Sequence, residues 1–416
     1  MSWLTWNRNL KIRLFGETLF NMLFWMYFPF LTIYFSESIG VIEAGIMMTA
    51  PSIISIFGGM LGGYIADEYG RRKIMLIGSF IQAMFFALFA LSISPWFDYM
   101  AFIGISLGKS FYRPASSAMV ADLVSDQERR NVFATFASAN NIGAVLGPVI
   151  GAVLFFQYRT ELLWTCTFVT FLYSGIILAL MRETIPIQKS KQNTTAFSVI
   201  MKHWKSYLHI LKDKVYLYYI IGGMFITVSM MQLDLYLALY VKNYIQTQTL
   251  FSIGDWSFSL NSEQIFGWMI GLNGLLFVLL VIPVTKKING WSDRNALILA
   301  ASLSGMGMFS VGLSTNIWLL FILTVIFTIG EIIHGPVVQN FAVSYAPKNA
   351  RGQYIGASDL QYSFGRFIAP FTVILSSIFP PIFIFGFILL CACISAIIYI
   401  KMFHIIDLKK KEAIEN

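Results

Sequence analysis

The chain has 416 residues, of which 57% are hydrophobic and only 12% charged. A soluble domain is about one quarter charged, so this composition excludes an ordinary water-soluble protein and indicates a chain whose solvent is lipid. The net charge of +8 does not indicate nucleic-acid binding, because the basic residues lie in short segments between apolar runs.

Twelve apolar runs are long enough, at about 20 residues each, to cross a bilayer as helices. In chain order we predict spans at residues 14–36, 42–65, 74–94, 99–121, 132–156, 162–181, 215–241, 264–285, 295–314, 316–343, 353–378 and 381–402. Backbone exposed to lipid must form its hydrogen bonds within its own segment, so helices are the only interpretation, and we expect no alternating short strands. The predicted fold class is therefore an all-α membrane protein with twelve transmembrane helices.

The basic residues also predict the orientation of these spans. With the amino terminus inside, most of the 29 Lys and Arg residues fall on the cytoplasmic side, and the outside keeps only Arg159 and Lys242. The positive-inside rule therefore places both termini in the cytoplasm. No cleavable signal is apparent, because the first apolar run is too long for a signal core.

The longest polar insert, residues 182–214, follows the sixth span. It predicts an amino-terminal six-helix bundle at 1–181, a cytoplasmic basic linker at 182–214, and a carboxy-terminal six-helix bundle with a short tail at 215–416. Two similar halves joined by a basic linker match the layout of alternating-access carriers. The linker itself is most simply a tether that lies on anionic lipid.

A short basic loop joins the second and third spans and reads Gly-Tyr-Ile-Ala-Asp-Glu-Tyr-Gly-Arg-Arg-Lys over residues 63–73. We expect Gly63 to let the end of its helix approach a neighbour closely and Gly70 to permit a tight turn. Asp67 can bond the free amides of a helix start or a nearby arginine. A plain positive-inside anchor is the alternative, but it does not account for the spacing of Gly and Asp.

The fifth span contains Gly143, Gly147, Pro148 and Gly151. The three glycines are four residues apart, so they form one smooth helix face that permits close backbone contact with another helix. We expect Pro148 to bend the helix. The alternative is that these small residues serve only to pack two helices together and indicate no particular function.

These features together resemble the major facilitator superfamily. The 63–73 loop resembles its loop-2/3 signature, and span five resembles the Gly-x-x-x-Gly-Pro-x-x-Gly pattern of its proton-coupled antiporters. The stretches Tyr112-Arg113-Pro114-Ala115 and Arg351-Gly352-Gln353-Tyr354 are similar to twelve-span drug/proton antiporters, particularly multidrug exporters of the lactococcal type. The resemblance implies two pseudo-symmetric six-helix bundles in a bacterial plasma (inner) membrane.

The resemblance also implies site roles. It implies a conformational latch that joins the amino-terminal half to the helix beginning near Gly352, with the residues Gly63, Asp67, Gly70, Arg71, Arg72 and Asp122. Three positions depart from the family pattern: Glu68 replaces a basic residue, Phe102 an arginine, and Phe136 a carboxylate. The departures at Phe102 and Phe136 imply that other residues bind and release the proton in this chain, whereas Glu68 bears only on the charge relay of the loop.

Charged residues inside the spans are the candidates for that work, because a charge at the bilayer centre costs about 2.5–3.5 kcal/mol unless it is paired or faces a wet cavity. Glu331 is the first candidate proton carrier, followed by Asp234 and Glu17. The alternatives are a static ion pair of Glu331 with Arg366 or Arg113, a partly solvated rim acid at Asp234, and an interfacial acid at Glu17.

Lys109 and Arg113 are four residues apart, so they share a helix face and need carboxylates or an anion. The family's central cavity is lined by helices 1, 4, 7 and 10, so the resemblance implies that the candidate carboxylates face these cations. We predict the cavity lining as Lys109, Arg113, Arg366, Tyr112, Trp25, Tyr236, Tyr362, His334 and Asp359. For any one aromatic residue, packing against lipid or protein is the competing interpretation.

We find no phosphate loop, hydrolase elbow or zinc pattern, so we predict no enzyme activity, no cofactor and no metal site. We predict a proton-coupled secondary transporter that exports small lipophilic or amphipathic compounds, as in multidrug efflux and antibiotic resistance. The partners expected are protons, a small-molecule substrate and membrane lipids, with no nucleic acid, and the chain is expected to be a monomer. The alternatives are an anionic cargo such as a metabolite, siderophore or lipid-linked solute, and a non-transporting membrane sensor.

Overall fold

The computed structural model describes residues 6–184, 201, 210–288, 290–347 and 351–415. Contacts between residues divide the chain into two compact units. Unit 1 comprises Met1–Glu43 and Met47–Met201, and unit 2 comprises Ala44–Ile46 and Lys202–Asn416. Most of the linker predicted at 182–214 lies outside the described residues, so the division placed there stays a prediction.

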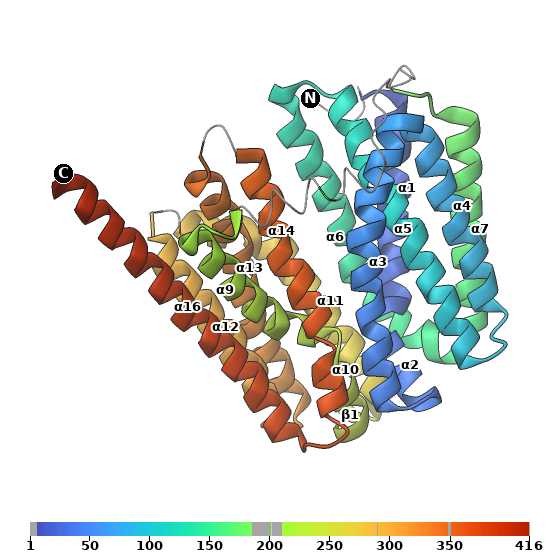
Figure 1. Cartoon of the computed structure of the whole chain (residues 1–416). Coiled ribbons are helices and arrows are strands. Elements are labelled where there is room, and N and C mark those ends of the chain that lie inside the picture. The colour runs from blue at the N-terminus through green and yellow to red at the C-terminus, as the bar shows by residue number, and fades with distance from the viewer. Residues whose placement is uncertain (1–5, 185–200, 202–209, 289, 348–350, 416) are drawn as a thin grey trace. The chain divides into compact units, whose positions relative to one another are not determined.

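The described residues of unit 1 form helices without strands (Figure 1). The elements are α1 (Arg8–Tyr27), η2 (Phe28–Phe30), α2 (Leu31–Ser38), α3 (Val41–Tyr69), α4 (Arg71–Ala90), α5 (Pro95–Leu123), α6 (Asp126–Gln157) and α7 (Arg159–Leu180). Pro29 lies in the short 3-10 helix η2 and interrupts the first span, because proline has no N–H to donate to the helix ladder.

Unit 2 contains the remaining spans. Its elements are α9 (Lys214–Met230), η3 (Met231–Leu233), α10 (Tyr236–Tyr244), β1 (Gln248–Ile253), β2 (Trp256–Leu260), α11 (Ser262–Ile288), α12 (Asp293–Val311), α13 (Ile317–Tyr345), α14 (Arg351–Ile368), α15 (Phe371–Leu375) and α16 (Pro381–Glu415). Two spans of this unit are interrupted, one at η3 and one between α14 and α15, where Pro370 precedes α15.

The same helix pairs recur in the two units. In unit 1, α1 packs along α6, and α4 packs along α5 and α7. In unit 2, α9 packs along α14, and α12 packs along α13 and α16. Counted within each unit, these are the first span with the fifth, and the third span with the fourth and sixth. This repeated pairing is expected of two structurally similar halves.

Every predicted span corresponds to a helix or an interrupted helix. Within the described chain, nine helical segments are long and apolar enough to cross a membrane. The other predicted spans correspond to α5, α12 and α14. The all-α prediction is therefore confirmed for the spans.

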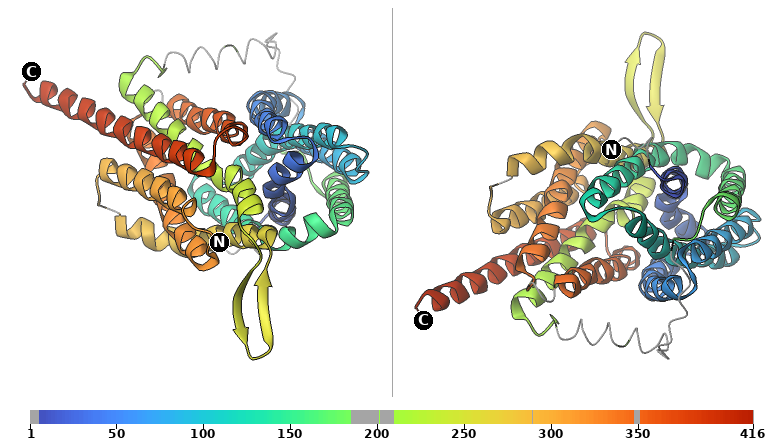
Figure 2. Two further views of the ribbon diagram at one scale, coloured as in Figure 1. Left: turned by 90° about the horizontal axis from the view of Figure 1, so that it is seen from below. Right: turned by 90° about the horizontal axis from the view of Figure 1, so that it is seen from above.

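The expectation of no strands is wrong for one segment. Strands β1 and β2 form an antiparallel hairpin between α10 and α11, which projects from the ends of these helices in both views of Figure 2. The segment lies between two spans, where its backbone groups need not be satisfied within one helix. Gly254 adopts a φ of +58° at the turn, a conformation that glycine permits without steric cost.

Candidate transport site

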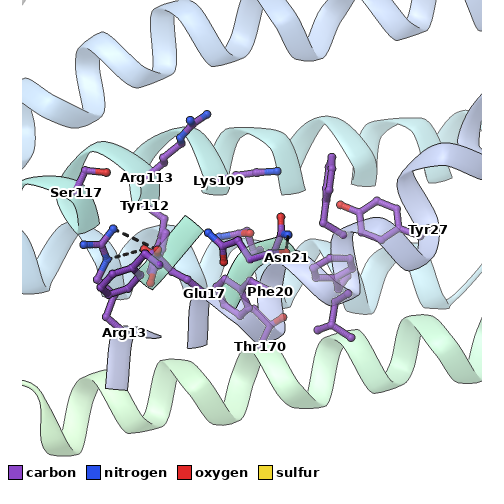
Figure 3. A pocket seen from close by; sticks show the side chains of 16 residues that line it. Arg13, Glu17, Phe20, Asn21, Tyr27, Lys109, Tyr112, Arg113, Ser117 and Thr170 are labelled. Carbon is purple, nitrogen blue, oxygen red and sulfur yellow. Dashed lines mark hydrogen bonds and ion pairs between the residues drawn. The ribbon is translucent and has the colours of Figure 1, made fainter. Parts of the chain in front are cut away.

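Unit 1 contains an open cavity of about 430 Å³ lined by residues of α1, α4, α5, α6 and α7 (Figure 3). Its wall combines ionisable and aromatic side chains, as expected for a site that binds amphipathic molecules. The lining residues used below are Arg13, Glu17, Asn21, Phe24, Lys109, Tyr112, Arg113, Phe136 and Asn140. Of the residues predicted to line a cavity, Lys109, Arg113 and Tyr112 are among them.

Glu17 forms a two-pronged ion pair with Arg13, one helical turn earlier on α1 (Figure 3). The Arg13 Nε donates to Glu17 Oε1 at 2.7 Å, and Nη2 donates to Oε2 at 3.2 Å. The Ser116 hydroxyl of α5 also donates to Glu17 Oε1. Glu17 lines the same cavity as Lys109 and Arg113. The guanidinium of Arg13, on its own helix, bonds both of its carboxylate oxygens.

The two cations of α5 are arranged along one side of the cavity, as their spacing predicts (Figure 3). The Lys109 ammonium lies 3.5 Å from the centre of the Phe24 ring, a cation–π contact. Both side chains are exposed, so neither charge is sealed away from the cavity. With Arg13 and Glu17 included, this wall carries more positive than negative charge, which favours a ligand with a negative or electron-rich group.

Phe136, which departs from the family pattern, also lines this cavity. Its ring lies 4.5 Å from the Arg13 guanidinium carbon and stacks on Trp6 at 6.0 Å. A carboxylate at this position would compete with Glu17 for Arg13. The aromatic ring instead holds the guanidinium by its face, so the Arg13–Glu17 pair stays intact.

The glycine face of span five packs against α1, the close contact that its spacing predicts. A Cβ added to Gly143 would lie 2.6 Å from the Met22 N, and one added to Gly151 would lie 2.7 Å from the Met26 Cα. At Gly147 a Cβ would lie 2.6 Å from the Trp25 Cβ, so the predicted cavity residue Trp25 contacts the glycine seam. Pro148 lies inside α6 one residue further on.

The first candidate proton carrier, Glu331, is held on α13 by a polar group of α11. Asn273 Nδ2 donates to Glu331 Oε2 at 2.6 Å and to the Thr328 hydroxyl at 3.0 Å. Glu331 is half-buried, and it interacts electrostatically with Asp234. In the described structure the hydrogen-bond partner of Glu331 is therefore the neutral amide of Asn273. The static ion pair with an arginine, the alternative interpretation, is not among its described contacts.

Asp234 lies at the interruption between α9 and α10. Beside it, Gln232 Nε2 donates to the Ala369 carbonyl at 3.3 Å, and Thr372 Oγ1 donates to Gln232 Oε1 at 2.6 Å. These bonds join the two interrupted spans of unit 2 and satisfy backbone groups that the breaks release. Interrupted helices near the middle of a transporter are typical of ion and substrate sites. Arg366 on α14 also interacts electrostatically with Asp234.

The remaining predicted residues of unit 2 lie in several environments. His334 is 2% exposed and its Nε2 lies 3.3 Å from the Tyr399 hydroxyl of α16, whereas Glu331 contacts α11. Tyr236 is buried and packs edge-on against Phe385. Asp359 and Arg366 are exposed, and both interact electrostatically with the half-buried Tyr362. His334 and Tyr236 therefore pack between helices in the described structure.

The 63–73 loop is braced within unit 1 at the ends of α5 and α7. Arg71 forms ion pairs with Asp67 and, at 3.4 Å, with Asp122. Gly70 has a φ of +103°, the turn conformation expected of it. Arg72 donates to the carbonyls of Ile177, at 3.3 Å, and Leu178. The predicted latch to the helix beginning near Gly352 stays a prediction.

Among the described residues of unit 1, Gly63 makes no close approach, so the close contact expected of it stays a prediction. A Cβ added to Gly63 would meet Pro114 at an ordinary 3.8 Å. The close contact belongs to Gly62, where a Cβ would lie 2.8 Å from the Phe111 Cα. The neighbouring glycine therefore faces α5, because one residue turns a helix by about 100°.

Glu183 caps the amino terminus of α4 and is absent from the predicted site. It accepts from the backbone N–H groups of Arg71 at 2.9 Å and Arg72 at 3.1 Å. The first N–H groups of a helix have no partner within the helix, and a carboxylate there also interacts favourably with the helix dipole. Glu183 thus fixes the start of α4 to the end of α7.

We expect Glu183→Ala to lower the melting temperature of the purified protein. Loss of a capping side chain costs about 1 kcal/mol, which corresponds to a shift of about 2–4 °C for a unit of this size. Thermal unfolding of the wild type and variant measures the shift. Glu183→Gln keeps one acceptor oxygen and is expected to lose less; equal losses for both variants would contradict the capping role.

Sequence reasoning gave no site role to Asn273, Arg13 and Gln232. Asn273 is an isolated amide in a strongly apolar span, and Gln232 lies two residues before a predicted carboxylate. Arg13 stands four residues before Glu17, the spacing of an ion pair on one helix face. A search for every polar residue inside or beside the spans, not only for acids, would have found all three.

Comparison with known proteins identifies the class. The family model of the Major Facilitator Superfamily matches residues 14–370 and 243–412, and the chain belongs to this family. It is a multi-pass membrane transporter and not an enzyme. A solved structure of a POT family transporter in complex with 5-aminolevulinic acid has the same fold, with a TM-score of 0.78 and 16% identity over 95% of each chain.

Two curated relatives bear on the cargo. The Na(+), Li(+), K(+)/H(+) antiporter of Planococcus maritimus is 36% identical to this chain over 414 residues, which cover 97% of each sequence. The multidrug resistance protein MdtH of Photorhabdus laumondii is 26% identical over 360 residues, covering 85% of this chain and 82% of the relative. Both are similar in length to this chain.

Proposed function

We propose that this protein exchanges protons for a cation across the membrane by alternating access, with Glu331 and Asp234 as the groups that bind both. The observation that carries the proposal is the polar cluster of unit 2. Glu331 is held by the neutral Asn273 amide, and Asp234 lies close enough for the two charges to interact. Two neighbouring carboxylates repel each other, so a proton or a cation between them is favourable.

Inorganic monovalent cations are the first cargo to test. Oxygen atoms are the ligands that such hard cations prefer, and the carboxylate of Glu331 and the hydroxyl of Thr328 come together where both accept from the Asn273 amide. The Planococcus maritimus relative, named for antiport of Na⁺, Li⁺ and K⁺ with H⁺, supports this choice. We propose that the protein resides in a bacterial plasma membrane with both termini in the cytoplasm, as the distribution of Lys and Arg predicts.

Efflux of amphipathic compounds is the second candidate. It is favoured by the cavity of unit 1, where the rings of Phe24 and Phe136 lie beside charged side chains. Rings of this kind stack on flat lipophilic molecules. The similarity to MdtH supports the same cargo class at lower identity. The positive wall formed by Lys109 and Arg113 favours compounds with a negative or polar group, including the anionic cargo considered above.

Everted membrane vesicles with an acidic interior separate these candidates. Addition of Na⁺, Li⁺ or K⁺ is expected to release protons from the vesicles, measured by recovery of a pH-sensitive dye, whereas choline chloride is expected to have no effect. Recovery with ethidium or an organic anion, but with none of the three inorganic cations, would favour the second cargo class. No proton release with any solute would contradict proton antiport altogether.

A further inference from the structure

The hairpin between α10 and α11 is amphipathic. Its register pairs Phe251 with Phe258 and Ile253 with Trp256, so these four side chains lie on one face. The opposite face carries the hydroxyl pairs Ser252–Ser257 and Thr249–Ser259. The Thr249 and Ser259 hydroxyls are 3.0 Å apart, within hydrogen-bond distance. An apolar aromatic face and a hydroxyl face therefore share one two-stranded sheet.

The apolar face forms one contiguous exposed patch. The ring centre of Phe251 lies 5.5 Å from those of both Trp256 and Phe258. Nevertheless, Ile253 is 72% exposed, Trp256 56% and Phe251 43%. Large exposed apolar groups that cluster in this way mark an interaction surface.

The base of the hairpin is fixed to the ends of membrane helices. Gln248 Nε2 donates to the Thr315 carbonyl at 2.6 Å, and the backbone N–H of Ile317, the first residue of α13, donates to Gln248 Oε1 at 3.0 Å. Ile245, which precedes β1, and Leu260, the last residue of β2, are both buried. From this base the hairpin extends sideways past the ends of α10 and α11 (Figure 2). It therefore begins at the level where these helices leave the membrane.

We propose that this hairpin lies on the bilayer surface, with its aromatic face in the headgroup–acyl boundary and its hydroxyl face toward water. The base of the hairpin is bonded to the start of α13, whose first turns also expose large apolar side chains, Trp318, Leu319 and Ile322. Trp and Phe are suited to this boundary because their rings are apolar or amphipathic. The partner is thus lipid, and the contact does not depend on which cargo is carried.

The charge and the backbone of the hairpin determine how deeply it enters the bilayer. The only ionised side chain of residues 246–261 is Asp255, at the turn. A polybasic attraction to anionic lipid is therefore absent from this segment, and the contact depends on apolar burial. A two-stranded sheet has unpaired N–H and C=O groups along both edges, and these cannot enter the hydrocarbon core without a large cost. The hairpin therefore stays at the boundary.

Fluorophores on opposite faces test this arrangement. Cys166 and Cys391 are buried, so Cys393→Ser removes the exposed thiol of the described chain. In that full-length background, Ile253→Cys and the adjacent Ser252→Cys are each labelled with the dye NBD and reconstituted in phosphatidylcholine–phosphatidylglycerol liposomes. These liposomes carry a nitroxide quencher at a shallow or a deep acyl position.

We expect NBD at position 253 to emit at shorter wavelength than NBD at 252 and to be quenched more by the shallow than by the deep nitroxide. NBD at 252 is expected to be quenched by aqueous iodide. Trp256→Ser is expected to shift the emission of the 253 label toward that of the 252 label. Equal iodide quenching at both positions would overturn the proposal. Shielding of position 253 without nitroxide quenching would also overturn it and would indicate a second copy or another protein as partner.

Discussion

Glu331→Gln is expected to abolish the exchange of protons for cargo while leaving the protein folded. Glutamine keeps the size of the side chain and one acceptor oxygen, so the bond from the Asn273 amide, at 2.6 Å in the wild type, can be retained. It cannot bind or release a proton. Under the proposed mechanism this removes the coupling step itself, so the expected loss of pH-driven flux is complete, not partial.

The measurement is pH-driven solute movement in proteoliposomes, compared with exchange of labelled for unlabelled solute at equal pH on both sides. We expect the first to disappear and the second to persist. Asp255→Asn, at the exposed turn of the hairpin, removes an acid outside the spans and serves as the matched control. Undiminished proton coupling in Glu331→Gln would remove Glu331 from the mechanism and leave Asp234 as the candidate.

Gly143→Ala is expected to give the second large effect, through packing and not through charge. Its new Cβ would lie 2.6 Å from the Met22 N and 2.8 Å from the Met22 Cα, distances that real Cβ atoms do not reach. Both atoms belong to the backbone of α1 and cannot rotate away, so α1 and α6 must move apart. Overpacking of this kind costs about 1–3 kcal/mol.

The displaced helix carries Arg13, Glu17 and Phe24, so the cavity of unit 1 is expected to lose its geometry along with the packing. We expect a lower melting temperature and a loss of transport activity. Gly175→Ala is the matched control, because a Cβ added there meets no atom within 4 Å. If both glycine variants behaved like the wild type, α1 and α6 could not be in the close contact described here.

The two units present different chemistry to a cargo. The cavity of unit 1 is lined by Arg13, Lys109 and Arg113 with one carboxylate, Glu17. In unit 2 the carboxylates Glu331 and Asp234 stand beside neutral amides. The two candidate functions follow from this difference: the first uses the acids of unit 2 for proton and cation exchange, and the second uses the aromatic and basic wall of unit 1 to bind larger solutes.

Pairing between side chains was where sequence reasoning failed. The sequence predicts Glu17, Lys109 and Arg113 as ionisable groups inside spans, and three of the predicted lining residues do line one cavity. It did not predict which side chain pairs with Glu17, because distance in space between α1 and α5 is not encoded in spacing along either helix. The nearer Arg13 decided the pairing.

The sequence by itself determined the membrane class and the helical nature of every span, because lipid leaves the backbone few choices and the length of each apolar run is read directly from the sequence. The 63–73 loop and the glycine pattern of span five also determined the family. The sequence further determined that the glycine face of α6 must meet a helix. Only the tertiary structure decided that this helix is α1, that Asn273 holds Glu331, that Gly62 rather than Gly63 approaches α5, and that residues 248–260 form a hairpin. These are contacts between segments distant in the chain or outside the lipid, where packing and not hydropathy selects one arrangement among many.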